Sequence, residues 1–135
     1  MNYSDCPNWS RWLAEFKDKP CHALEIGSYL GESAVWFAEN ILTHPESTLL
    51  CLDAWVAIEP YKSRGTNMQE VFETFKINVR FHEKIDFWRC TIAAEVALCW
   101  IVWDEMAVFI DHWRDHLRRL PLDLPGRTVR AKDCD

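Results

Sequence analysis

Two glycines and two carboxylic acids in the first half of the chain have a spacing that suits nucleoside binding. Gly27 and Gly31 follow a short apolar stretch, with Glu25 just before them. Glycine permits a sharp turn and a close approach of the backbone to a ligand, and the amides that begin the next helix point to the same place. Asp53 ends the next apolar stretch, where a carboxylate can accept both hydroxyl hydrogens of a ribose.

The glycine spacing separates one class of ligand from another. The pattern is Glu-x-Gly-x-x-x-Gly, whereas a dinucleotide pyrophosphate requires Gly-x-Gly-x-x-Gly. A nucleoside without phosphates is therefore favoured, and a nucleotide-dependent oxidoreductase is disfavoured. An ordinary turn between a strand and a helix is the alternative interpretation of the same glycines.

The elements that must position these residues alternate along the chain. Hydrophobic spacing predicts helices at 9–16, 33–42, 68–79 and 113–120, and favours one at 93–103. Strands are predicted at 22–26, 48–52, 84–88, 106–110 and 127–131. This alternation predicts an α/β fold, a doubly wound Rossmann-like parallel sheet of about five strands. We expect a helical segment at 1–20 and the Rossmann-like domain at 21–135.

Composition narrows the classes of partner. The 135 residues carry 21 acidic and 15 basic side chains, a formal charge of −6, whereas nucleic-acid and membrane-surface binding call for a basic surface. The longest apolar run, 96–103, is far short of the roughly 20 residues of a membrane-spanning helix. The six cysteines lack the Cys-x-x-Cys spacing, and no export signal is visible, so we expect reduced thiols and a cytoplasmic location.

Three segments carry a resemblance to a known family. Residues 24–35, Leu-Glu-Ile-Gly-Ser-Tyr-Leu-Gly-Glu-Ser-Ala-Val, resemble motif I of class I S-adenosylmethionine-dependent methyltransferases. Residues 108–115, Val-Phe-Ile-Asp-His-Trp-Arg-Asp, are similar to the Asp-His-Trp signature of catechol O-methyltransferases. Residues 127–134 match more weakly the strand of that family that ends in Asp-Asn. Residues 28–55 also resemble a broader methyltransferase group that lacks this metal signature.

The resemblance implies a set of site residues. It assigns the methionine part of S-adenosylmethionine to the glycine turn, the ribose to Asp53, and the adenine to two residues after the fourth strand. The residues expected to bind the cofactor are Glu25, Gly27, Ser28, Tyr29, Gly31, Ser33, Asp53, His112 and Trp113. Asp111 and Asp133 would bind Mg²⁺, which would orient a small hydroxylated acceptor and lower the pKa of its hydroxyl.

The sequence departs from that family in three places. Arg114 stands where the family has a lysine base, and a guanidinium stays protonated at any working pH. Cys134 replaces an asparagine ligand and is a poor partner for Mg²⁺, and residues 90–92 do not match the family's adenine loop. The chain also stops just after the fifth predicted strand, so we expect an incomplete sheet and self-association through its open edge.

Two hypotheses follow. The first is an S-adenosylmethionine-dependent O-methyltransferase that acts on a small molecule and has no assigned catalytic base. The second is a non-catalytic, truncated or degenerate member of the fold that binds the nucleoside cofactor weakly or not at all. In the second hypothesis, Asp111 and Asp133 only cap strand ends, and Trp113 belongs to the core.

Overall fold

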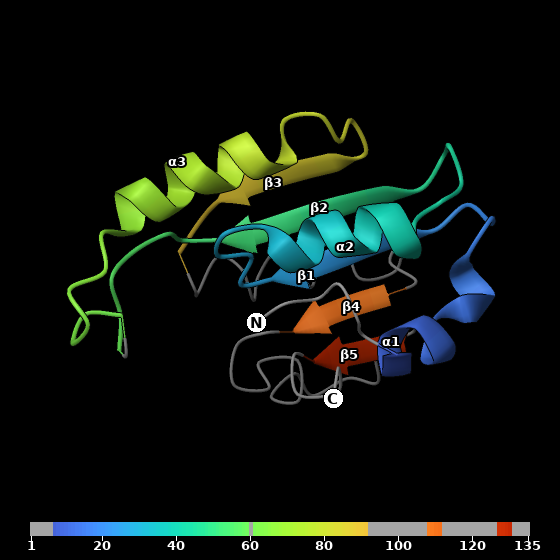
Figure 1. Ribbon diagram of the computed structural model, residues 1–135, viewed down its shortest axis with the longest axis horizontal. Helices are drawn as coiled ribbons and strands as arrows, with labels where there is room; N and C mark the ends of the chain where they lie inside the picture. Colours follow the sequence, from blue (N-terminus) through green and yellow to red (C-terminus); the bar gives the residue numbers. More distant parts are fainter. Residues whose placement is uncertain (1–6, 60, 92–107, 112–126, 131–135) are drawn as a thin grey trace.

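The protein has a mixed α/β fold built on a parallel sheet (Figure 1). A computed structural model describes residues 7–59, 61–91, 108–111 and 127–130. The strands are β1 (His22–Ile26), β2 (Thr48–Asp53), β3 (Ile85–Arg89), β4 (Val108–Asp111) and β5 (Arg127–Arg130). The helices of the described residues are α1 (Pro7–Trp12), the 3₁₀ turn η1 (Ala14–Phe16), α2 (Glu32–Asn40) and α3 (Met68–Val79). The predicted α/β class with a parallel sheet is confirmed.

The strand order places β1 at the centre of the sheet. The order is β3-β2-β1-β4-β5, and each neighbouring pair is parallel. The chain therefore builds outward from β1 through β2 to β3, and then crosses to the other side of β1 for β4 and β5. In register, Ile26 lies beside Leu52 of β2 and beside Asp111 of β4. The carboxyl ends of β1, β2 and β4 therefore lie side by side at one end of the sheet.

One face of the sheet packs against the described helices. Trp9 of α1, Phe37 of α2 and Phe75 of α3 are fully buried in one cluster with strand residues. The strand residues of this cluster are Ala23, Leu49, Cys51, Val108 and Ile110. They alternate with Leu24, Ile26 and Leu52, which are also buried and face the opposite side of the sheet. The sheet is thus apolar on both faces, as a parallel sheet requires.

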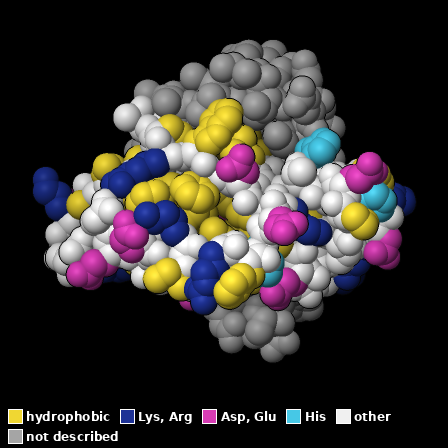
Figure 2. All heavy atoms as spheres, turned by 90° about the horizontal axis from the view of Figure 1, so that it is seen from above, with side chains coloured by type: hydrophobic (Ala, Val, Ile, Leu, Met, Phe, Trp, Pro, Cys, Tyr) yellow, Lys and Arg dark blue, Asp and Glu magenta, His cyan; other side chains and the backbone are white. Residues whose placement is uncertain are grey.

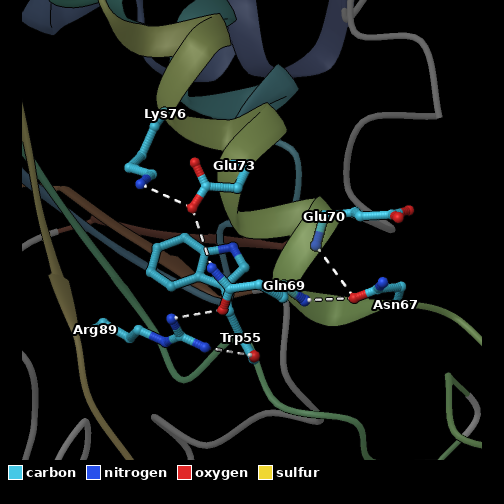
Figure 3. Close-up of polar contacts among 7 residues, drawn as sticks. All are labelled: Trp55, Asn67, Gln69, Glu70, Glu73, Lys76 and Arg89. Carbon is cyan, nitrogen blue, oxygen red and sulfur yellow. Dashed lines mark hydrogen bonds and ion pairs between the residues drawn. The ribbon is translucent and has the colours of Figure 1, made fainter.

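Helix α3 begins and ends where its sequence predicts. The Asn67 side chain accepts hydrogen bonds from the amides of Gln69 and Glu70 at 3.1 and 3.3 Å, which caps the helix (Figure 3). Its buried stripe is Met68, Val71, Phe75 and Val79. The helix predicted at 68–79 is therefore confirmed at both ends.

The predicted N-terminal helix at 9–16 is wrong as a single element. Helix α1 ends at Trp12, and a 3₁₀ turn follows from Ala14. The Leu13 amide still bonds to the Trp9 carbonyl at 2.9 Å, but Phe16 then bonds to Leu13 at 3.0 Å, one residue short of the α-helical spacing. The tighter turn follows Trp9 and Leu13, both of which are completely buried.

Exposed hydrophobic side chains share the surface with charges. The face seen from above in Figure 2 interleaves hydrophobic side chains with Lys, Arg, Asp and Glu. Phe81 is the most exposed large hydrophobic residue of those described, and the Arg80 guanidinium lies 4.5 Å from the centre of its ring. Strands β3 and β5 stand at the two edges of the sheet. Self-association through an edge stays a prediction.

Some predicted elements cannot be compared. The helices expected at 93–103 and 113–120 lie outside the described residues. Across the part of the chain that is described, every helix is too short or too polar to cross a membrane.

Candidate functional site

The turn after β1 contains three residues with positive φ. Gly27, Tyr29 and Gly31 have φ values of 84°, 49° and 80°. The Gly27 amide bonds to the Leu52 carbonyl at 2.8 Å, and the Gly31 amide bonds to the Ser28 carbonyl at the same distance. A non-glycine residue in this conformation costs about 1–2 kcal/mol, so contacts from elsewhere must hold Tyr29 in place.

Asp53 provides those contacts. Its Oδ2 accepts the Tyr29 amide and its Oδ1 accepts the Trp55 amide, both at 2.9 Å. The Trp55 indole Nε1 in turn donates to the Tyr29 carbonyl at 2.9 Å. These three bonds form a closed circuit, here called the Asp53 ring, that joins the turn after β1 to the turn after β2. Trp55 also has a positive φ, 45°, so the ring stabilises two strained residues together.

Burial governs the ionisation of Asp53, which is 4% exposed. Desolvation raises the pKa of its carboxyl above the ordinary value, while the amide hydrogen bonds from Trp55 and Tyr29 oppose the rise. The cost of ionising a buried carboxyl therefore outweighs the hydrogen bonds that favour its charged form.

A pH dependence of stability follows from this raised pKa. Between the ordinary pKa and the raised one, the folded state binds more protons at Asp53 than the unfolded state, so the free energy of unfolding falls as pH rises through that window. Urea unfolding of the wild type and of Asp53→Asn, at several pH values from acid to neutral, isolates this contribution. We expect the stability of the wild type relative to the variant to fall with rising pH. A relative stability that rises with pH would show that the amide bonds dominate.

A second buried polar group lies beneath the turn. The Ser33 hydroxyl donates to Glu25 Oε2 at 2.6 Å, and the Cys51 thiol donates to Glu25 Oε1 at 3.7 Å. Burial and the nearby Glu25 carboxylate raise the pKa of the Cys51 thiol well above its ordinary value. Cys51 is therefore a neutral hydrogen-bond donor rather than a nucleophile.

Ser28 lies near Cys51 but does not share in the hydrogen bonds that join Glu25, Ser33 and Cys51. Its side chain is buried, and its hydroxyl has no hydrogen-bond partner at ordinary distance among the residues that the structure describes. The hydroxyl lies near the Cys51 sulfur and lowers the pKa of that thiol in part. A buried hydroxyl without a hydrogen bond is costly, which marks Ser28 as a group that a ligand could satisfy.

Gly31 has a packing role in the structure. A Cβ at this position would lie 2.9 Å from Cδ2 of Phe75 and 3.1 Å from Cγ1 of Val79. Asn78 of the same helix donates to the Leu30 carbonyl at 2.8 Å. The second glycine of the motif therefore lets α3 pack against the turn, and its part in cofactor binding stays a prediction.

Aromatic side chains surround the Asp53 ring. The rings of Tyr29 and Tyr61 stack with centroids 5.0 Å apart and an interplanar angle of 11°. The pKa of Tyr61 is raised by burial first, and also by the nearby Tyr29 and Asp53. The Trp55 indole packs against Phe72 and Phe75 at 4.7 Å. Aromatic rings thus pack on both Tyr29 and Trp55, the two residues whose amides Asp53 binds.

The structure brings part of the predicted site together. Those residues are Glu25, Gly27, Ser28, Tyr29, Gly31, Ser33 and Asp53. Asp111 ends β4 beside Ile26, at the same carboxyl end of the sheet, but its side chain is not described. His112, Trp113, Arg114, Asp133 and Cys134 lie outside the described residues. Among the residues that are described, no three His, Cys, Asp or Glu side chains are grouped to hold a metal ion.

Trp55, Tyr61 and Arg89 were missed by sequence reasoning. Residues 55–67 fall between the strand predicted at 48–52 and the helix predicted at 68–79, and the positive φ of Trp55 leaves no signal in the sequence. Arg89 read only as the residue after a short strand.

Comparison with known proteins adds no relative to this picture. The chain matches no family model, and it matches no curated protein.

Proposed function

We propose that this chain is an S-adenosylmethionine-dependent methyltransferase domain whose cofactor binds where β1 and β2 end. The observation that supports this most is the position of the Asp53 ring. It lies next to β1, the strand at which the order β3-β2-β1-β4-β5 changes direction. That order agrees with the first five strands of the doubly wound Rossmann-like fold, in which ligands bind at this point, outside the carboxyl ends of the strands.

The residues present suit such a cofactor. The Asp53 carboxylate meets the backbone amides of Tyr29, Trp55 and Ala54, and because its two oxygens offer about four acceptor sites, a lone pair is left for a ribose hydroxyl. The buried Ser28 hydroxyl, for which the described residues offer no partner at ordinary distance, can give one more hydrogen bond, and Gly27 keeps the backbone beside it free of a side chain. When bound, S-adenosylmethionine would supply the methyl group of its sulfonium: the acceptor oxygen would bond to the methyl carbon as the carbon–sulfur bond breaks, and S-adenosylhomocysteine would leave. The role of these residues is to hold and align S-adenosylmethionine.

The acceptor belongs to the same proposal. By its resemblance to catechol O-methyltransferases, the chain would methylate a small hydroxylated molecule, with Mg²⁺ held by Asp111 and Asp133. The position of Asp111 at the end of β4, beside Ile26, supports this assignment for one of the two ligands. We assign no catalytic base, because Arg114 cannot accept a proton.

One observation favours the second candidate, a non-catalytic domain. Both oxygens of Asp53 already accept backbone amides, so the ring explains this buried carboxylate without a ligand. In that case the glycine turn survives as a structural feature only.

Calorimetric titration of S-adenosylhomocysteine separates these candidates. We expect micromolar binding by the wild type and about 10- to 100-fold weaker binding by Asp53→Asn, because a hydrogen bond to a charged group contributes about 1.5–3 kcal/mol. Asp86→Asn is the matched control, since Asp86 is an exposed carboxylate of the edge strand β3. This variant should bind S-adenosylhomocysteine with the affinity of the wild type. Absence of binding by the folded wild type would contradict the proposal.

Two further assays complete this test. Methyl transfer to a catechol in the presence of Mg²⁺ would support the enzyme, whereas binding of S-adenosylhomocysteine without transfer to any acceptor tried would favour the non-catalytic domain. Binding of NADH in place of S-adenosylhomocysteine would favour an oxidoreductase.

A further inference from the structure

Arg89, at the end of β3, connects three elements around the candidate site. Its Nε donates to the Ala54 carbonyl and its Nη2 to the Trp55 carbonyl, both at 3.3 Å. Its Nη1 donates to Gln69 Oε1 of α3 at 3.1 Å. Figure 3 shows the guanidinium extended between Trp55 and Gln69, and it also lies 4.6 Å from the centre of the Phe72 ring.

The acceptors of Arg89 are informative. All three are neutral oxygens, and the ion pairs found among the described residues are Lys76–Glu73 and His82–Glu39. Hydrogen bonds from a charged donor to neutral oxygens are stronger than those between neutral groups. The planar fork of a guanidinium can reach two adjacent carbonyls at once, which the point charge of a lysine cannot do equally well. The geometry therefore uses the shape of arginine as well as its charge.

The two carbonyls belong to the residues that immediately follow Asp53. Trp55 is one of the two strained residues of the Asp53 ring, with a φ of 45°, and its amide faces Asp53 while its carbonyl faces Arg89. The Ala54 carbonyl lies in the peptide plane that also carries the Trp55 amide, and the Trp55 carbonyl lies in the next plane, so the two hydrogen bonds from Arg89 together orient the planes on both sides of Trp55. Arg89 is thus placed to hold the conformation that directs the Trp55 amide at Asp53.

The other end of the connection is itself fixed. The backbone amide of Gln69 donates to Asn67 Oδ1 at 3.1 Å, and its side-chain Nε2 donates to Glu73 Oε1 at 3.0 Å. Lys76 contacts the same Glu73 oxygen at 3.0 Å. Because Gln69 is held on both sides, Arg89 links the turn after β2 to the rigid first turns of α3 (Figure 3).

We propose that Arg89 is a positioning residue for the candidate site. It acts through the carbonyls of Ala54 and Trp55 to hold the Asp53 ring in its closed form. Its effect on cofactor affinity rests on the proposed function, whereas its effect on the ring does not.

The test measures hydrogen exchange at the amides of Tyr29 and Trp55 and at the Trp55 indole in Arg89→Gln and Arg89→Lys. We expect exchange at these groups to be at least about 10-fold faster in Arg89→Gln, with a smaller acceleration in Arg89→Lys. Arg80→Gln is the control, because Arg80 is another arginine on the surface whose contacts are the Ile77 carbonyl and the Phe81 ring. Arg80→Gln should leave hydrogen exchange at the groups of the Asp53 ring unchanged.

Three outcomes would overturn the proposal. Unchanged exchange at Trp55 in a folded Arg89→Gln protein would show that the ring does not depend on this side chain. Equal acceleration at Trp55 and at Leu24 in the centre of the sheet would show a loss of overall stability only. Identical results for Arg89→Lys and the wild type would show that the fork is unnecessary. If the wild type binds S-adenosylhomocysteine, affinity should weaken by about 3- to 10-fold in Arg89→Gln. If the wild type does not bind S-adenosylhomocysteine, the exchange measurement still tests whether Arg89 holds the Asp53 ring.

Discussion

Replacing Gly31 with alanine is expected to lower the free energy of unfolding by about 2–5 kcal/mol. The left-handed conformation of this residue, φ 80°, would cost alanine about 1–2 kcal/mol. The new Cβ would also press on Phe75 at 2.9 Å and on Val79 at 3.1 Å, and overpacking of a core costs about 1–3 kcal/mol. Urea denaturation followed by far-ultraviolet circular dichroism would measure the loss.

Gly65→Ala is the matched control for this prediction. Gly65 also has a positive φ, 67°, but a Cβ there meets no atom within 4 Å. This variant should therefore show the backbone cost alone, about 1–2 kcal/mol. The difference between the two variants measures the packing of α3 against the turn, and equal losses would contradict a role for Gly31 in that packing.

Replacing Trp55 with alanine is expected to cost about 3–5 kcal/mol of unfolding free energy. The side chain is 1% exposed and packs against Phe72, Phe75 and Phe87. Its removal leaves a large cavity and deprives the Tyr29 carbonyl of the indole hydrogen bond. Thermal and urea unfolding would give the magnitude.

Two companion variants separate the contributions of Trp55. Trp55→Phe keeps an aromatic ring but loses the bond to Tyr29, so about 1 kcal/mol of its loss should come from the hydrogen bond. Trp88→Ala removes a tryptophan that is 43% exposed and should cost much less than Trp55→Ala. A comparable loss in Trp88→Ala would mean that tryptophan burial does not explain the effect at Trp55.

The sequence was most informative where the periodicity was clear. Residues 22–26 and 68–79 form β1 and α3 with the predicted bounds, because short buried runs and an amphipathic stripe depend on nearby residues. The other compared elements differ at their ends, and α2 runs from Glu32 to Asn40 rather than 33–42. The glycine turn and Asp53 were likewise found from local spacing.

The Asp53 ring could not be found in this way. Positive φ at Tyr29 and Trp55 is unfavourable for either residue alone and is stable only because Asp53 binds both amides. The packing role of Gly31 depends on Phe75 and Val79, more than 40 positions further along the chain. Arg89 acts on carbonyls, which every residue has, so its side chain gave no pattern to recognise.

If an S-adenosyl nucleoside binds at the ends of β1 and β2, the backbone amides around it will respond to the ligand. Isotope-labelled protein would be titrated with S-adenosylhomocysteine while backbone amide signals are followed by nuclear magnetic resonance. We expect the largest shifts at residues 27–31 and at Trp55, with little change at α1. Shifts confined to residues far from the carboxyl ends of β1 and β2, or the absence of shifts, would contradict binding of the nucleoside there.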